Sequence, residues 1–427
     1  MKKYSTETKC VQGTYKPKSG QPRVLPIVQS TTYQYYDSDD VADLFDLKSA
    51  DHMYSRISNP TVAEFEGKMA LLEGGVGAVA ASSGQAATTL AILNICNAGD
   101  HIIAASTIYG GTFNLLGVTL KKLGIQVTFV DPDSSDEEII ASGRENTKAV
   151  FGETIGNPGL NILDFEKFSR VAKTLDVPFI VDNTLATPVL CRPFEHGVDI
   201  VIHSATKYTD GHATSVGGIV IDGGTFNWDN GKFPELVDPD PSYHGISYVK
   251  DFGPAAYITK ARVQLLRDFG MTLSPFSAFL FHLGLETLHL RMERHCENAL
   301  ALAEFLQGHP GVEWVNYPYL ETHKTYGTAK KYLKGGSGIL TFGIKGGAQA
   351  GKELVKHLDL TGLVVHLGDL RTSILHPAST THRQLTEDQQ IAAGVSPDLI
   401  RVSVGIEGID DIIADFDNAI NQTTKGI

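Results

Sequence analysis

The sequence predicts an α/β fold in which helices cover both faces of a mostly parallel sheet, followed by a smaller C-terminal α/β domain. Three observations indicate this architecture. Between residues 61 and 222, short apolar runs alternate with amphipathic stretches. Residues 222–254 then break into Gly-, Pro- and Asp-rich sequence. After the break come long helical patterns and a second, smaller set of apolar runs.

The N-terminal part predicts an arm, a helix and then the alternating region. The first 60 residues are polar and turn-rich, so an extended arm without sustained helices is expected. A helix is predicted over 61–73, because apolar residues recur at helical spacing and two glycines follow as a stop signal. Strands are predicted over 77–82, 101–105, 126–130, 149–153, 179–182, 200–203 and 217–221. Helices are predicted over 84–97, 112–123 and 163–175.

The C-terminal part follows a long loop. Residues 222–254 are expected to form this loop and to keep aromatic residues able to pack. Helical patterns cover 274–306, and strands are predicted over 337–344 and 399–404. The chain is therefore expected to divide into an N-terminal arm (1–60), a ligand-binding α/β domain (61–254) and a C-terminal α/β domain (255–427). Ligands of such sheets bind beyond the carboxyl ends of the strands.

The composition excludes several classes of protein. The 427 residues are 42% hydrophobic and 20% charged, which suffices for two domains with a large core. The net charge of −13 disfavours nucleic acid or an anionic membrane as a partner. The four cysteines show no CxxC spacing, and the first residues lack the apolar segment of a signal peptide. No apolar run approaches the roughly 18–20 residues of a membrane span. We therefore expect a cytoplasmic enzyme with small-molecule partners.

Three motifs resemble binding signatures but predict other structures. Residues 75–80 match the loose GxGxxA dinucleotide pattern, yet they follow a helix and enter a strand, which is the reverse order. Residues 346–353 nearly spell a P-loop, but Glu353 replaces the magnesium-binding hydroxyl, so a turn opening a helix is expected. His376 and His382 fit no zinc spacing, and no metal site is expected.

Lys207 and Asp182 carry the strongest chemical signal in the sequence. Asp182 closes the predicted strand 179–182, and Lys207 lies shortly after the next predicted strand, 200–203. Neighbouring parallel strands end at the same edge of a sheet, so both side chains are expected to face one small cofactor. Pyridoxal phosphate (PLP) needs this pair: a lysine for the Schiff base and an acid that keeps the pyridine nitrogen protonated.

A phosphate site is predicted where residues 82–87 join a strand to a helix through Gly84. The N–H groups at a helix start favour an anion, although an ordinary N-cap explains the same residues. Ser204 and Thr206 add hydroxyl donors that would reach the same phosphate. Arg56 would add a charge-assisted hydrogen bond, or it is a solvated surface charge.

Three further polar residues draw attention. Tyr109 follows strand 101–105 and would stack on the pyridine ring, or it is a partly buried loop residue. Asn157 lies just beyond strand 149–153 and would donate to the ring hydroxyl, or it is a turn residue before proline. Arg401 lies inside an apolar strand, where a buried guanidinium needs an anion. The carboxylate of an amino acid substrate is one candidate, and a protein salt bridge is the other.

Taken in order, these motifs resemble the Cys/Met-metabolism PLP enzymes. The segments are Tyr54-Ser-Arg-Ile-Ser-Asn-Pro-Thr61, Ser82-Ser-Gly84, Val181-Asp-Asn-Thr184, Ser204-Ala-Thr-Lys207, His376-Pro-Ala-Ser-Thr-Thr-His382 and Arg401-Val-Ser-Val-Gly-Ile-Glu407. Their order and spacing span nearly the whole chain. Within this family the O-acetylhomoserine sulfhydrylases are the most similar, on the basis of residues 216–224, 233–245 and 393–401.

The resemblance implies a type I aminotransferase-like fold and a homotetramer built from two dimers. It implies that Tyr54 and Arg56 reach the phosphate in the neighbouring subunit's site. Within the subunit it implies phosphate binding by Gly84, Gln85, Ser204 and Thr206, ring stacking by Tyr109, a contact of Asp182 with the ring nitrogen, and binding of the substrate carboxylate by Arg401.

The activity implied is PLP-dependent γ-replacement on O-acetyl-L-homoserine. Sulfide or methanethiol would replace acetate, giving L-homocysteine or L-methionine. Lys207 is the expected proton shuttle, assisted by Tyr109 or the neighbour's Tyr54. The alternatives are a methionine γ-lyase and an enzyme of the cystathionine lyase or synthase type, which carry out β- or γ-elimination at the same cofactor site.

Two departures from the family pattern bear on specificity. Methionine γ-lyases carry a cysteine where this chain has Gly111, which disfavours the lyase alternative. His366 stands where relatives usually show serine or asparagine near the substrate carboxylate, so it is a candidate substrate-binding residue.

Overall fold

The computed structural model describes residues 4–381, 383 and 395–425, and within them the strands form two sheets. The larger sheet has seven strands in the order β1-β7-β6-β5-β4-β2-β3. These strands are β1 (Gly77–Ala81), β2 (His101–Ala105), β3 (Gln126–Val130), β4 (Thr147–Glu153), β5 (Phe179–Asp182), β6 (Ile200–His203) and β7 (Gly218–Asp222). Only β7 runs antiparallel to its neighbours, so the prediction of a mostly parallel sheet is confirmed.

Helices cover the larger sheet. Every residue of β2, β6 and β7 is buried, which requires cover on both faces of the sheet. Helices α3 (Pro60–Glu73), α4 (Gly84–Leu93) and α7 (Phe165–Leu175) pack against its strands. The connections place the carboxyl ends of β4, β5 and β6 side by side, because these strands are neighbours and run parallel.

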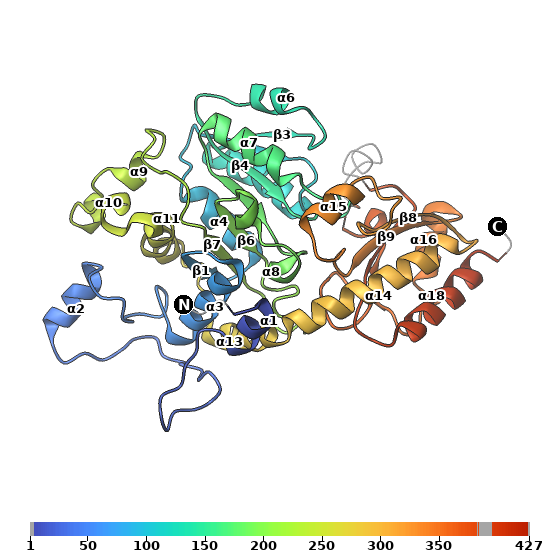
Figure 1. Cartoon of the computed structure of the whole chain (residues 1–427), viewed down its shortest axis with the longest axis horizontal. Helices are drawn as coiled ribbons and strands as arrows, with labels where there is room; N and C mark the ends of the chain where they lie inside the picture. The colour runs from blue at the N-terminus through green and yellow to red at the C-terminus, as the bar shows by residue number, and fades with distance from the viewer. Residues whose placement is uncertain (1–3, 382, 384–394, 426–427) are drawn as a thin grey trace.

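A second sheet lies in the C-terminal part of the chain, in the order β10-β11-β12-β9-β8. Its strands are β8 (Val312–Asn316), β9 (Ile339–Ile344), β10 (Gly362–Leu363), β11 (Ser373–Leu375) and β12 (Leu399–Ser403). Helices α14 (Leu288–Gly308), α16 (Gly347–Leu354) and α18 (Ile409–Thr423) pack with it. In Figure 1, α14 runs from the side of the larger sheet to the smaller one.

The buried apolar residues form two clusters. The larger cluster extends through α13 (Pro275–Glu286) to Met292, early in α14. The smaller cluster begins at Ala299 and includes one face of α14's second half together with residues of β9, β12 and α18. The helix α14 therefore contributes to both cores. The limits 1–60, 61–254 and 255–427 stay a prediction.

The predicted strands of both sheets agree with the structure to within two residues at either end. Some helices differ. The predicted helix 112–123 is instead a short helix, α5 (Gly110–Asn114), followed by a π-helical turn (Leu115–Thr119) and a 3-10 turn (Leu120–Leu123). The predicted segment 274–306 is two helices, α13 and α14, that meet at Thr287. The strands β8, β10 and β11 were not predicted, because they are short and weakly alternating.

The expectation of an arm without helices is wrong at two places. Residues 4–59 contain α1 (Thr6–Gln12) and α2 (Ser38–Phe45). Ser5 and Asp37 cap these helices by accepting hydrogen bonds from Thr8 N and Asp39 N. Both helices are too short to show a clear apolar period in the sequence. The rest of the arm is largely irregular, and it extends away from the sheets in Figure 1.

The motifs set aside in the sequence have the structures expected of them. Residues 75–80 lead from α3 into β1, and Gly346, at φ 95°, opens α16. Residues 222–254 form a loop with short helical turns, in which Trp228, Phe233 and Tyr248 are buried. In the described part of the chain, no helix combines the length and apolarity needed to cross a membrane.

Candidate active site

The site lies where β4, β5 and β6 end. Glu153, Asp182 and His203 are the last residues of these strands. Glu153 pairs in register with Asp182 on the neighbouring strand. Lys207 follows β6 through a tight turn, in which its N–H donates to Ser204 O at 3.2 Å. Asp182 and Lys207 therefore both follow the carboxyl ends of adjacent parallel strands.

Asp182 is held by the residue two positions later. Its Oδ1 atom accepts hydrogen bonds from Thr184 N at 2.9 Å and from Thr184 Oγ1 at 2.5 Å. Burial raises the pKa of Asp182, while the two bonds from Thr184 and the nearby His203 act to lower it. The Thr184 hydroxyl also accepts a hydrogen bond from Ser204 N at 2.8 Å, which joins the turns after β5 and β6.

Lys207 is a partly buried amine with a neighbouring histidine. Burial, and secondarily Arg401, lower the pKa of Lys207 to about 8. Its Nζ atom lies 3.4 Å from His366 Nδ1. A side chain at Gly368, whose φ is +78°, would crowd the backbone of Lys207 and Tyr208, so a glycine allows the two loops to approach. A substantial fraction of the amine is therefore unprotonated near neutral pH.

Arg401 projects from β12 toward the same region. Its guanidinium donates to His366 O at 3.1 Å. No carboxylate among the described residues lies within 4.0 Å of it, so the salt-bridge alternative is not seen in this part of the chain. Burial lowers the pKa of Arg401 to about 10. The guanidinium is available for an anionic ligand, and His366 contacts both it and Lys207.

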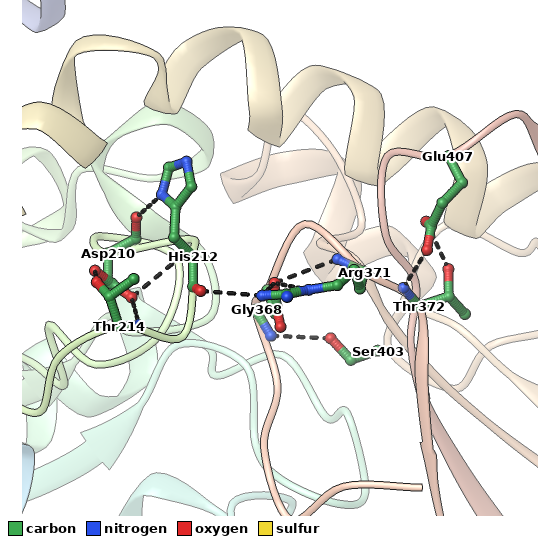
Figure 2. Close-up of polar contacts among 9 residues, drawn as sticks. Asp210, His212, Thr214, Gly368, Arg371, Thr372, Ser403 and Glu407 are labelled. Carbon is green, nitrogen blue, oxygen red and sulfur yellow. Dashed lines mark hydrogen bonds and ion pairs between the residues drawn. The ribbon is translucent and has the colours of Figure 1, made fainter. Parts of the chain in front are cut away.

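Polar contacts hold the loop that carries His366 against the segment after Lys207. Gly368 N donates to Ser403 Oγ at 2.9 Å, and Arg371 donates to His212 O at 3.0 Å. Figure 2 shows these contacts bridging the loop, the Asp210–Thr214 turn and the strand β12. Hydrogen bonds therefore join the loop that carries His366 both to β12 and to the turn after Lys207.

Tyr109 lies at the edge of the site with an exposed ring. Its N–H donates to Glu153 Oε2 at 2.6 Å, and 48% of its surface is exposed. Burial, and secondarily Asp182, raise the pKa of Glu153 well above its ordinary value. Glu153 thus ties the loop that carries Tyr109 to the strand beside Asp182. The exposed ring of Tyr109 is compatible with stacking on a pyridine ring, and it is also compatible with an ordinary loop residue that contacts no cofactor.

The predicted phosphate residues gather at the start of α4. A Cβ at Gly84 would lie 2.7 Å from Ser204 Cβ, so the helix start is pressed against the turn after β6. Ser83 caps α4 by accepting from Ala86 N at 3.0 Å, as the N-cap alternative requires. Gln85 Oε1 is buried and has no hydrogen-bond partner.

Two predicted residues have other contacts in this chain. The Thr206 hydroxyl donates to Gly217 O at 3.2 Å and accepts from Gly217 N at 3.1 Å. Asn157 is buried in a turn that packs against the loop of Tyr109, since a Cβ at Gly156 would overlap Thr107 O. Contact of either side chain with a cofactor stays a prediction.

Tyr54 and Arg56 lie apart from the other predicted residues. Arg56 donates to Arg267 O at 2.8 Å and its guanidinium lies 5.4 Å from the centre of the Tyr54 ring. No recorded hydrogen bond or ion pair joins either residue to Lys207 or Asp182 within the described part of this chain. Both belong to the arm, and both are exposed.

Both ring nitrogens of His376 are within hydrogen-bonding distance of other groups of the protein. Its two ring nitrogens lie 2.7 Å from Ser379 Oγ and 2.8 Å from Pro397 O. His382 lies outside the described residues. Among the residues that the structure describes, no group of three or more potential ligands could hold a metal ion.

The residues present fit PLP. A strand-end carboxylate and a lysine with a lowered pKa occupy one edge of the sheet. The start of α4 is pressed against Ser204 beside them. The guanidinium of Arg401, which has no carboxylate of the described residues within 4.0 Å, completes the set with an anion-binding group. These are the groups needed for the ring nitrogen, the aldehyde carbon, the phosphate and a substrate carboxylate.

Comparison with known proteins agrees with this fit. The model of the Cys/Met metabolism PLP-dependent enzymes matches residues 7–421. The chain belongs to this family.

Individual relatives cover nearly the whole chain. It is 49% identical to the O-acetyl-L-homoserine sulfhydrylase of Leptospira meyeri, over 98% of this chain and 97% of the relative. It is 48% identical to the homocysteine synthase of Schizosaccharomyces pombe, over 93% of this chain and 94% of the relative. A Campylobacter jejuni structure assigned as an O-acetylhomoserine (thiol)-lyase, which contains a pyridoxyl-lysine phosphate, superposes with a TM-score of 0.94 at 37% identity, covering 98% of this chain and all of that one. This PLP-dependent family member therefore has the type I fold predicted for it.

Sequence reasoning missed three polar residues in and around the site, two at strand ends and one at the end of α3. Glu153 closes a predicted strand in the same way as Asp182, and that position was a usable signal. Thr184 lies two residues after Asp182, where a short polar side chain often bonds backward. Glu73 contacts His203 across 130 positions of the chain, and no local pattern indicates this.

Proposed function

We propose that this PLP-dependent enzyme catalyses γ-replacement on O-acetyl-L-homoserine. Sulfide or methanethiol replaces acetate, and the product is L-homocysteine or L-methionine. The observation that supports the proposal is the arrangement of three groups: Lys207 follows the strand next to Asp182, and His366 contacts both Lys207 and Arg401. The near-full-length similarity to sulfhydrylases and homocysteine synthases supports this substrate class.

Lys207 has two roles in this proposal. It attaches the cofactor, and its amine then moves protons at the α- and β-carbons of the substrate. A pKa of about 8 suits both roles, because the amine can accept and return a proton near neutral pH. Bound PLP supplies a conjugated ring that draws negative charge away from the α-carbon.

Asp182 holds the ring nitrogen in its protonated form. Thr184 fixes the carboxylate with two hydrogen bonds, so the acid cannot rotate away from the site. Asn157 donates to the ring hydroxyl from the turn after β4. Tyr109 stacks on the ring from the loop tied to Glu153, and it assists proton transfer.

Arg401 binds the α-carboxylate of the substrate. The two N–H groups of a guanidinium suit a carboxylate, and no protein carboxylate of the described residues competes for them. His366 lies between Arg401 and Lys207 and contributes to the same pocket. By orienting the substrate, Arg401 and His366 exclude binding positions in which the amino acid cannot react.

The phosphate is bound by the start of α4 and by the turn after β6. Gly84, Gln85, Ser204 and Thr206 supply donors from within the subunit. Tyr54 and Arg56 supply donors to a neighbouring subunit, which accounts for their distance from the other groups of their own chain. This sharing implies a dimer, and we propose a homotetramer formed from two such dimers. We place the enzyme in the cytoplasm.

A substrate panel on the purified holoenzyme tests the proposal. The enzyme is incubated with O-acetylhomoserine plus sulfide or methanethiol, with O-succinylhomoserine plus sulfide, and with methionine or cystathionine alone. We expect homocysteine or methionine together with acetate from the O-acetyl substrate. Faster release of 2-oxobutyrate from methionine or cystathionine would instead establish a lyase. Lys207→Ala serves as the inactive control.

A further inference from the structure

A buried polar cluster lies directly behind the catalytic carboxylate. We define it as Glu73, Thr154, Asn183 and His203, all of which are buried. Glu73 ends α3, and the other three residues lie at the ends of β4, β5 and β6. Thr154 directly follows Glu153 in the sequence, and Asn183 directly follows Asp182. The cluster therefore connects the backs of the three strands whose ends bind the cofactor.

The hydrogen bonds of the cluster converge on one oxygen of Glu73. Glu73 Oε1 lies 2.6 Å from His203 Nε2 and accepts from Asn183 Nδ2 at 2.9 Å. Asn183 Nδ2 also donates to Cys191 O at 3.0 Å, and Thr154 Oγ1 donates to Asn183 Oδ1 at 2.8 Å. A backbone carbonyl can only accept, so these contacts fix the orientation of the amide.

The buried carboxylate of Glu73 needs a positive partner. Its exposed fraction is 0%, and Oε2 has no hydrogen-bond partner. A carboxylate removed from water is strongly unfavourable unless a cation or a proton neutralises it. The nearest cationic side chain from a neighbouring element, Arg192, pairs with Glu195 and donates only to the backbone oxygen of Glu73. His203 is the only basic side chain of the described residues within 4.0 Å of the carboxylate.

The cluster bears on Asp182 through His203. Two acids are neighbours on adjacent strands, since Glu153 pairs in register with Asp182. Burial and this like-charged neighbour favour protonated acids at the strand ends, and burial raises the pKa of both carboxyls. His203 and the two hydrogen bonds from Thr184 act in the opposite direction on Asp182, because they lower its pKa.

We propose that Glu73 and His203 form a buried ion pair whose imidazolium keeps Asp182 ionised opposite the ring nitrogen of PLP. Both are positioning residues: Glu73 acts through His203, and His203 acts through Asp182. The proposal deepens the proposed function and rests on its PLP chemistry, but not on which thiol or leaving group the enzyme uses. A lyase with the same site would need the same pair.

The test compares two cofactors in the full-length protein. Wild-type enzyme and the variants His203→Gln and Glu73→Gln are freed of PLP and reconstituted with PLP or with its analogue that has carbon in place of the ring nitrogen. We expect each variant to bind PLP about tenfold more weakly, as for a change of about one unit in the pKa of Asp182. Binding of the analogue should be unchanged or tighter, because it carries no proton for Asp182 to hold.

Two controls separate charge from structure. His101→Gln removes another buried histidine of the same sheet, which contacts Thr147 and Thr128 at the opposite strand ends, and it should not distinguish the two cofactors. The double variant Glu73→Gln/His203→Gln should bind PLP no more weakly than His203→Gln alone. An equal loss of both cofactors, or no loss of either, would overturn the proposal.

A direct measurement covers variants that fail to fold. Histidine-selective nitrogen labelling of the wild-type holoenzyme reports by NMR whether both ring nitrogens of His203 carry protons. The signal is assigned through its spatial contact with the Asn183 amide, which shares Glu73 Oε1 with it. Two protonated nitrogens at pH 7.5 support the ion pair, and a neutral ring contradicts it. Neither this readout nor cofactor binding involves a substrate, so failure of the sulfhydrylase assay would leave both results interpretable.

Discussion

The hydroxyl of Thr184 donates to Asp182 Oδ1 at 2.5 Å. The same hydroxyl accepts from Ser204 N at 2.8 Å, so one side chain fixes the Asp182 carboxylate and the turn that leads to Lys207. A hydroxyl can donate one hydrogen bond while accepting another. This relationship couples the position of Asp182 to that of the turn after β6.

Removal of this hydroxyl should loosen both elements. Thr184→Val keeps the shape but leaves Ser204 N unpaired, at a cost of about 1 kcal/mol in the free energy of unfolding. We expect weaker PLP binding and a lower kcat, measured by fluorescence titration and by the sulfhydrylase assay. Thr184→Ser retains the hydroxyl and should behave like the wild type. Equal behaviour of the valine and serine variants would show that the bond has no role.

The lowered pKa of Lys207 predicts the pH dependence of cofactor attachment. Only the unprotonated amine reacts with the aldehyde, so the rate of imine formation by the apoprotein should rise with pH and reach half its maximum near the pKa of about 8. Arg401→Gln removes the cationic neighbour that helps to lower this pKa, so the curve should move to higher pH. Arg401→Lys retains the charge and should shift the curve less. An unmoved curve for Arg401→Gln would contradict this electrostatic coupling.

Glu153 should make folding stability depend on pH. Burial raises its pKa above the ordinary 4.5, so the folded state binds the proton more tightly than the unfolded state. The stability from this bound proton is complete below about pH 4.5 and decreases as pH rises toward the folded pKa. Glu153→Gln keeps an acceptor for Tyr109 N and removes the titration, so its Tm should fall less between pH 5 and 8. The exposed Glu137→Gln is the matched control; parallel Tm curves for Glu153→Gln and wild type would refute this.

Gly111 should be sensitive to any side chain. A Cβ at this position would overlap the ring of Tyr109 and lie 2.7 Å from Gln85 Nε2. Gly111→Cys should therefore displace Tyr109, raise the KM for O-acetylhomoserine and reduce kcat by about tenfold or more, as expected for misplaced groups in an active site. Gly327→Ala, in a position with open space around it, should have no effect. Unchanged kinetics in Gly111→Cys would show that the position of the Tyr109 ring does not limit catalysis.

Local sequence patterns sufficed for the larger sheet. Its strands are short, buried apolar runs bounded by turns, and the strand 179–182 and its acid were both evident from the sequence. Helix ends were less clear, because they depend on tertiary contacts. The helix that starts at Gly84 ends at Leu93, and the side chain of the next residue, Asn94, donates to Tyr257 O on a distant segment.

Long-range contacts account for what the sequence did not predict. Lys207 and Asp182 could be paired because β5 and β6, which are consecutive in the sequence, are also parallel neighbours in the sheet. The contact between Lys207 and His366 crosses 159 positions, and that between Glu73 and His203 crosses 130. Neither contact follows from periodicity or from a motif. Each depends on how helices and loops from distant segments fold onto the sheet.

Reduction of the holoenzyme with borohydride, followed by peptide mass spectrometry, tests the central claim most directly. Borohydride reduces the imine, so the cofactor stays covalently attached to the lysine that bound it. Lys68 is an informative internal comparison, because it is also buried and its pKa is also lowered to about 8. We predict a single pyridoxyl phosphate adduct on Lys207, and no visible absorbance from the imine in Lys207→Ala. An adduct on Lys68 or on any other lysine, with Lys207 unmodified, would contradict the account.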